Sequence, residues 1–275
     1  MLQALLIATA TGLATGLGVL PFLFRDTIPR RAYDAILGMG AGLMLSAATL
    51  GLLSAALENV RAHDVLNSLV LVEVLGGFVV GVLTLATMER LIPHEHARGH
   101  HEHIGRAHDG PAGDSLHPHE HEHHEHVRKG LLISGAMTIH RLPEGFAIGA
   151  GFAAGVTHAL GWVLAVAIAF QNVCEGAVMA APLRHAGWSR LRCFFVVTAT
   201  GLAIPVASIF GYLLTSHITG ALPFALALAS GALIYLISNE IIPETHSHGN
   251  EAVATLGLIA GFCVTILVKS LGDPH

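Results

Sequence analysis

Two short polar segments interrupt otherwise apolar stretches of the chain, and they share one pattern. Residues 140–145 read HRLPEG and residues 171–176 read QNVCEG. Each segment places a side chain that can bind a metal ion four residues before a glutamate, and residues four apart share one face of an α-helix. A carboxylate among apolar residues in a membrane is costly unless a cation compensates it. The pair therefore predicts an ion site inside a membrane. Its predicted ligands are His140, Glu144, Gln171 and Glu175.

The composition excludes most soluble classes of protein. The chain has 275 residues, of which 53% are hydrophobic and 12% charged, whereas a soluble domain carries about 25% charged residues. The three cysteines lie in apolar runs and form neither a disulfide framework nor a CxxC zinc pair. A net charge of −5 argues against a nucleic acid partner. No nucleophile–base pair or phosphate-binding loop is recognisable, so we expect neither an enzyme nor an organic cofactor.

The elements that must position the two segments are membrane-spanning helices. A span needs about 20 mainly apolar residues, and eight stretches qualify. The glycine content, 31 residues, favours close packing of these helices into one bundle. We therefore expect an all-α integral membrane protein with a single eight-span domain over residues 1–275. The predicted spans are 2–24, 32–57, 67–91, 129–153, 159–183, 193–215, 220–243 and 252–271.

The basic residues predict the orientation of these spans in the bilayer. An even number of spans puts both termini on one side, and eleven basic residues fall in or beside loops on the opposite face. Only Arg61 and Lys269 lie on the side of the termini, and Arg141 lies within a span. Because lysine and arginine accumulate in cytoplasmic loops, both termini are predicted to lie outside. The eleven are Arg25, Arg30, Arg31, Arg90, Arg98, Arg106, Arg128, Lys129, Arg184, Arg190 and Arg192.

The longest predicted loop, residues 93–128, joins the third and fourth spans and is unlike the rest of the chain. It contains twelve of the twenty histidines. We expect it to be disordered, because it has few apolar side chains to bury, and to bind divalent metal ions weakly on the cytoplasmic side. Residues 119–123 match the HExxH pattern of zinc proteases. In a tract built of histidine and glutamate such a match is expected by chance, and it does not indicate a protease.

The two segments and their place in the chain resemble the ZIP (Zrt/Irt-like) family of divalent metal transporters, in its bacterial form. The family pattern is His-Asn-x-Pro followed by an acid and glycine in the fourth span, and His or Gln followed three residues later by Pro-Glu-Gly in the fifth. The resemblance implies inverted repeats and a homodimer in the bacterial inner membrane. It also implies elevator-type alternating access, in which spans 1, 4, 5 and 6 move against a scaffold of spans 2, 3, 7 and 8.

Several further residues gain a role from this resemblance. Met44 in the second span matches a methionine that completes the metal site of the family. The seventh span contains a glutamate followed by Pro-Glu, and histidines follow it. These residues are expected to form the cytoplasmic exit: Glu240, Glu244, His246 and His248. On the outer face Glu58 and Asp273 are expected to attract cations.

Bacterial relatives bind a second ion through three further positions, and two of the three differ in this chain. Arg141 stands where the family has asparagine and Ile204 stands where relatives have glutamate, whereas Asn172 keeps the aspartate or asparagine of the fifth span. A guanidinium at mid-bilayer must be paired. We therefore expect Arg141 to take the place of a second ion and to pair with Glu144, Glu175 or both, which leaves a site for one mobile metal ion.

The mixed set of predicted ligands indicates which metal ions are transported. Two other functions remain open beside metal import. Imidazole, carboxylate, amide and thioether ligands together favour Zn²⁺, with Cd²⁺, Fe²⁺ or Mn²⁺ as other substrates. The sequence thus predicts import of zinc-like ions. One alternative is an exporter of the cation-diffusion class, which has six spans and paired histidine and aspartate sites. A second is a metal-binding membrane sensor or structural protein in which Arg141 impairs transport.

Overall fold

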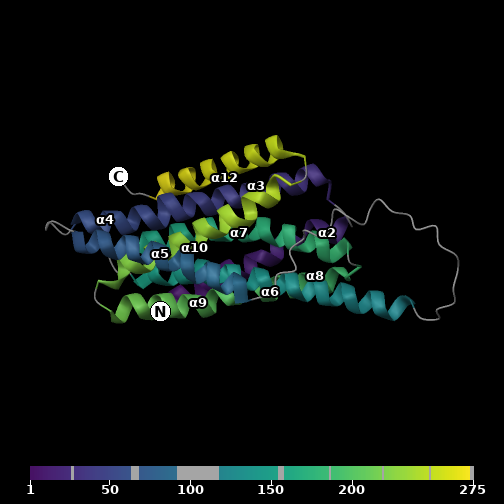
Figure 1. Cartoon of the computed structure of the whole chain (residues 1–275), viewed down its shortest axis with the longest axis horizontal. Helices are drawn as coiled ribbons and strands as arrows, with labels where there is room; N and C mark the ends of the chain where they lie inside the picture. Colours follow the sequence, from purple (N-terminus) through teal and green to yellow (C-terminus); the bar gives the residue numbers. More distant parts are fainter. Residues whose placement is uncertain are drawn as a thin grey trace.

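The computed structural model describes residues 1–25, 28–62, 68–91, 118–153, 158–185, 187–218, 220–247 and 249–272. All regular elements in these ranges are helices, which confirms the all-α prediction. The long helices run side by side as one elongated bundle (Figure 1). The start of α1 and the end of α12 lie toward the same end of the bundle, and α6 extends beyond the opposite end.

The described residues before Pro118 form three helical stretches. The first contains α1 (Leu2–Leu13), the 3-10 helix η1 (Ala14–Val19) and α2 (Pro21–Phe24). The second contains α3 (Arg30–Ser46), the π-helix η2 (Ala47–Leu53) and α4 (Ser54–Ala62). The third is the unbroken helix α5 (Ser68–Leu91).

Two long helices follow, and then three more helical stretches. The long helices are α6 (Pro118–Ala153) and α7 (His158–His185). Next come α8 (Arg190–Thr200) and α9 (Ala203–His217), separated by a short turn. The last two stretches are α10 (Ala221–Leu236) with the π-helix η4 (Ile237–Ile241) and α11 (Ile242–Thr245), and the unbroken α12 (Glu251–Gly272).

Seven helical stretches among the described residues are long and apolar enough to cross a membrane. They coincide with seven of the eight predicted spans. The eighth predicted span, 129–153, lies in α6 and is not among the seven; the side chains of its first residues lie outside the described part of the chain. The seven stretches confirm a multi-pass membrane protein, and the count of eight stays a prediction.

Helix α6 begins earlier than the sequence predicts. Its first residue is Pro118, well inside the stretch 93–128 for which we expected disorder. Proline is favoured at the first position of a helix, because it lacks only a hydrogen bond that this position does not make. Residues 92–117, which hold the rest of the histidine-rich tract, lie outside the described residues.

The three stretches before α6 and the three after α7 follow the same order. In each set an interrupted helix comes first, a helix with a π-helical insertion second and an unbroken helix third. The packing partners correspond as well, because α3 packs along α12 and α10 along α5, while α6 packs along α9 and α7 along η1. Among the described residues, the elements before α6 and those after α7 thus share their order and their kinds of packing partner.

Glycines bring paired helices into backbone contact. A Cβ atom added to Gly42 of α3 would lie 1.9 Å from the carbonyl oxygen of Leu258 in α12. One added to Gly261 of α12 would lie 2.1 Å from the carbonyl oxygen of Met39. Such small-residue interfaces are how membrane helices associate closely. The apolar side chains that remain exposed, such as Leu75 of α5 and Ile259 of α12, are suited to lipid contact.

Candidate metal site

Two glutamates and a glutamine from two neighbouring helices meet in the interior of the bundle. Glu144 projects from α6, and Gln171 and Glu175 lie one turn apart on α7. Gln171 Nε2 donates to Glu144 Oε1 at 2.6 Å and to Glu175 Oε1 at 2.9 Å. The exposed fractions are 0% for Glu144, 1% for Gln171 and 6% for Glu175. The structure therefore brings three of the predicted ligands into one buried, hydrogen-bonded cluster.

The glycine after each glutamate allows this arrangement. A Cβ on Gly145 would lie 2.2 Å from the carbonyl oxygen of Ile204 at the start of α9. A Cβ on Gly176 would lie 2.0 Å from the carbonyl oxygen of Thr15 in η1. Each glutamate therefore lies where the backbone of its helix touches a neighbouring helix. A residue larger than glycine at position 145 or 176 would push that neighbouring helix away.

Arg141 is completely buried beside the two glutamates. Its Nη1 donates to Asn172 Oδ1 at 2.6 Å and to Thr15 Oγ1 at 3.0 Å. Its Nη2 lies 3.4 Å from Glu175 Oε2. Asn172 in turn donates from Nδ2 to the carbonyl oxygen of Thr11 at 3.0 Å. Of the pairings that the sequence left open, the structure contains the one with Glu175, and the guanidinium joins η1, α6 and α7.

His140 faces a different set of acids from the one that the sequence predicts. Its Nε2 lies 3.2 Å from Glu240 Oε2 of η4. The ligand atoms of His140, Glu240 and Glu89 all lie within 4.8 Å of one another, close enough to hold a metal ion together. Sequence reasoning missed Glu89, because a charged residue in the last turn of an apolar span is not by itself a signal for a site. The predicted ligand set is therefore divided between two neighbouring clusters.

Of the remaining predicted residues, five lie within the described ranges and two lie outside them. Met44 is 1% exposed and belongs to the hydrophobic core cluster that includes Ala147 and Ile148 of α6. Ile204 is fully buried at the start of α9. Glu58 is exposed on α4, Glu244 is partly buried in α11 and His246 is exposed just after it. His248 and Asp273 lie outside the described residues.

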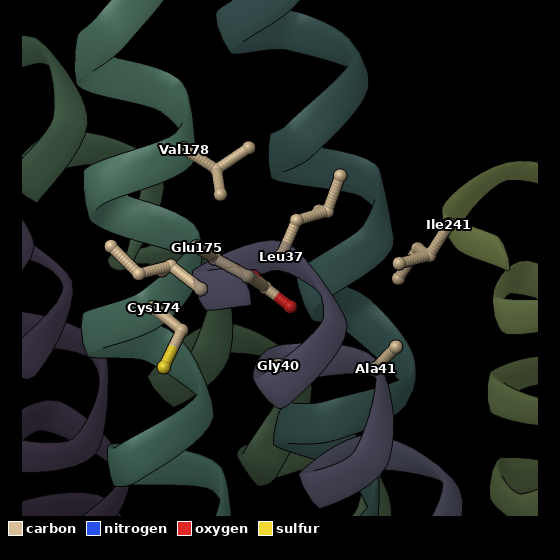
Figure 2. A pocket seen from close by; sticks show the side chains of 8 residues that line it. Leu37, Gly40, Ala41, Cys174, Glu175, Val178 and Ile241 are labelled. Atoms are coloured by element: carbon tan, nitrogen blue, oxygen red, sulfur yellow. The ribbon is translucent and has the colours of Figure 1, made fainter. Parts of the chain in front are cut away.

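A small hollow reaches Glu175 between α3, α7 and η4. Figure 2 shows the carboxylate of Glu175 directed into it. Apart from Glu175 and Cys174, its walls are glycine and aliphatic side chains, so among the described lining residues Glu175 alone is charged. The lining residues are Ile36, Leu37, Gly40, Ala41, Cys174, Glu175, Val178 and Ile241.

Comparison with known proteins gives one consistent result. The family model described as ZIP Zinc transporter matches residues 1–269. Zinc transporter GufA of Myxococcus xanthus is 37% identical over 269 residues, which cover 98% of this chain and 98% of the relative. Zinc transporter ZIPB of Bordetella bronchiseptica is 35% identical, with 94% of this chain and 77% of the relative covered. Zinc transporter ZupT of Corynebacterium glutamicum is 31% identical, with 96% and 97% covered.

Proposed function

The chain belongs to the ZIP zinc transporter family, and from that membership we propose that it carries Zn²⁺ and similar divalent ions across the bacterial inner membrane into the cytoplasm. The observation that carries the proposal is the buried cluster of Glu144, Gln171 and Glu175. Two carboxylates in the interior of a membrane protein are costly without a cation. Carboxylate oxygens bind Zn²⁺ at about 2.0–2.2 Å, so a small movement of these side chains suffices to coordinate it.

His140 supports a direction for the movement of the ion. On α6 it lies one turn before Glu144, on the side of Pro118 and of the predicted cytoplasmic loop. Its contact with Glu240 and its closeness to Glu89 support a second group of ligands on that side. We propose that His140 passes the ion from Glu144 and Glu175 to Glu89 and Glu240. Glu244, His246 and His248 then continue the exit path.

Arg141 supports a site for one ion. Its guanidinium lies 3.4 Å from Glu175 Oε2 and is held by Thr15 and Asn172. A second divalent ion bound there would meet this fixed positive charge in a setting of low dielectric constant. We propose that Arg141 replaces the second ion, and that the mobile site consists of Met44, His140, Glu144, Gln171 and Glu175.

The shared order of the elements before α6 and after α7 supports an elevator mechanism. Arg141 ties η1, α6 and α7 together, and α6 packs along α9. The other pairs, α3 with α12 and α5 with α10, contain most of the remaining long helices. We propose that η1, α6, α7 and α9 move as one unit against these pairs, and that the scaffold forms a homodimer.

Uptake of ⁶⁵Zn²⁺ into proteoliposomes tests the proposed function. Wild-type protein should take up the ion with saturation, and Glu144→Ala should abolish uptake, because the site loses one of its two carboxylates. Glu251→Gln, at an exposed position in the first turn of α12, is the matched control and should retain full uptake. Equal uptake by wild type and Glu144→Ala would contradict the assignment of the site.

The ion pair of Arg141 with Glu175 favours one alternative, a metal-binding membrane sensor or structural protein that does not transport. In that case wild type binds Zn²⁺ without uptake. Uptake would then be gained on replacing Arg141 by asparagine and Ile204 by glutamate.

A further inference from the structure

Gln171 stands between two carboxylates as a hydrogen-bond donor. Its amide nitrogen contacts Glu144 Oε1 at 2.6 Å and Glu175 Oε1 at 2.9 Å. The side-chain amide has two N–H donors on one end and one oxygen on the other. Turned the other way, it would place an amide oxygen against two carboxylates, which accept but do not donate. The surroundings therefore determine which end of the amide faces the glutamates.

We propose that the Gln171 amide competes with the transported ion for the same two carboxylate oxygens and makes a half-turn about its last side-chain bond when the ion binds. The inference rests on the proposed function and deepens it. Facing one way, the NH₂ group bridges the glutamates. Facing the other, the amide oxygen becomes a ligand of the ion. Gln171 is thus a ligand that also acts as the ion's competitor.

The confinement of Gln171 makes a rotation the available change. The side chain is 1% exposed, so it cannot swing out into solvent when the ion arrives. The two ends of an amide are nearly equal in size, and its terminal torsion is broad and roughly two-fold. A half-turn therefore exchanges nitrogen for oxygen without changing the packing around α6 and α7.

A first point of attachment for the ion remains open beside the amide. Glu144 Oε2 is buried and has no hydrogen-bond partner among the described residues. Glu175 Oε2 has the ion pair with Arg141 and no hydrogen bond in that same part of the chain. A divalent ion can bind Glu144 Oε2 before it displaces the amide from either Oε1 atom, so the exchange needs no step in which both glutamates lack a partner.

The competition explains why glutamine suits a transport site. Both hydrogen bonds to be displaced are charge-assisted, and such bonds are roughly twice as strong as neutral ones. They lower the net affinity for the ion, and on release the NH₂ group returns to bridge the carboxylates. A histidine at this position has only one ring N–H that can point toward the glutamates, so it cannot bridge them in the same way.

The chain offers a single-residue probe for this exchange, because Gln3 and Gln171 are its only glutamines. In Gln3→Ala protein labelled with [¹⁵Nε2]glutamine, the side-chain NH₂ signals in an NMR spectrum come from Gln171 alone. Because both NH₂ protons of Gln171 are hydrogen-bonded to carboxylates, their signals should lie downfield of those of a glutamine side chain without such bonds. Titration with Zn²⁺ should move both protons upfield in proportion to the bound ion, which is measured in parallel on the same sample.

The outcomes separate this inference from the proposed function. Zn²⁺ that binds while the Gln171 protons stay downfield would overturn the half-turn and leave the transport proposal intact. Failure of Zn²⁺ to bind at all would overturn both. Gln171→His protein, labelled at Gln3 only, is the matched control, and its NH₂ signals should not respond to Zn²⁺.

Discussion

At the scale of single residues, Arg141 is the clearest difference between this chain and the family pattern, which has asparagine at that position. The guanidinium has no exposed surface and contacts Thr15, Asn172, Met179 and Glu175. Lysine could not replace it, because an ammonium lacks the planar fork that reaches several acceptors at once. Removing the cation alone leaves the buried Glu175 without its ion-pair partner. We therefore expect Arg141→Ala to destabilise the protein by about 3–5 kcal/mol, the cost of breaking a buried ion pair.

A double substitution tests whether Arg141 occupies the place of a second ion. Arg141→Asn combined with Ile204→Glu removes the fixed charge and adds a carboxylate at the start of α9, beside Gly145. We expect this variant to bind one more equivalent of Zn²⁺ than wild type, measured by elemental analysis of the purified protein. Arg31→Asn, at an exposed position of α3, should bind as wild type does. An unchanged stoichiometry would contradict the replacement of an ion by Arg141.

At the scale of elements, backbone contact between helices determines where the polar side chains meet. The two neighbouring glycines of α5 show how specific this contact is. A Cβ on Gly77 would lie 2.5 Å from the carbonyl oxygen of Phe224 in α10, whereas a Cβ on Gly76 would have no atom within 4 Å.

Alanine substitutions at these two glycines should therefore differ in effect. Gly77→Ala should destabilise the protein by about 1–3 kcal/mol, because the added methyl group separates α5 from α10. Gly76→Ala should be neutral or stabilising by up to about 1 kcal/mol, since alanine is the better helix former. Thermal unfolding of both variants in the same detergent measures the difference. Equal melting temperatures would show that the α5–α10 contact is not tight.

At the scale of the whole molecule, the elevator proposal requires α7 to move relative to α3. The structure offers a way to prevent this. A Cβ on Gly40 of α3 would lie 3.5 Å from the Cβ of Cys174 in α7, within the range of about 3.5–4.5 Å found in disulfides. Gly40→Cys should therefore form a disulfide with the native Cys174.

Oxidation of Gly40→Cys should stop Zn²⁺ uptake, and a reductant should restore it, because the cross-link joins the proposed moving unit to the scaffold. Uptake by proteoliposomes before and after reduction gives the comparison, with cross-linking followed by mass spectrometry. Gly40→Cys in a Cys174→Ala background should not respond to the oxidant. Continued uptake by fully cross-linked protein would contradict a movement of α7 against α3.

The apolar helices and part of the candidate site could be predicted from the sequence, whereas other contacts of the site could not. Glu144, Gln171 and Glu175 were predictable because their spacing on two apolar helices is visible in the chain. The contact of His140 with Glu240 was not, because it depends on how α6 and η4 rotate toward each other. Glu89 was overlooked since it lies beside Arg90, where a charge at the end of a span is ordinary. The early start of α6 was hidden by the polar composition of residues 118–128.

By itself the sequence determined the membrane class, the positions of the apolar helices and the pairs of polar residues one turn apart. These properties depend on hydropathy and on helical spacing, and both are local to a short stretch of chain. Only the tertiary structure decided that Arg141 pairs with Glu175, that His140 joins Glu89 and Glu240, and that the Gln171 amide bridges two glutamates. Each of these contacts joins residues from different helices, and their geometry follows from the rotation and close approach of the helix backbones.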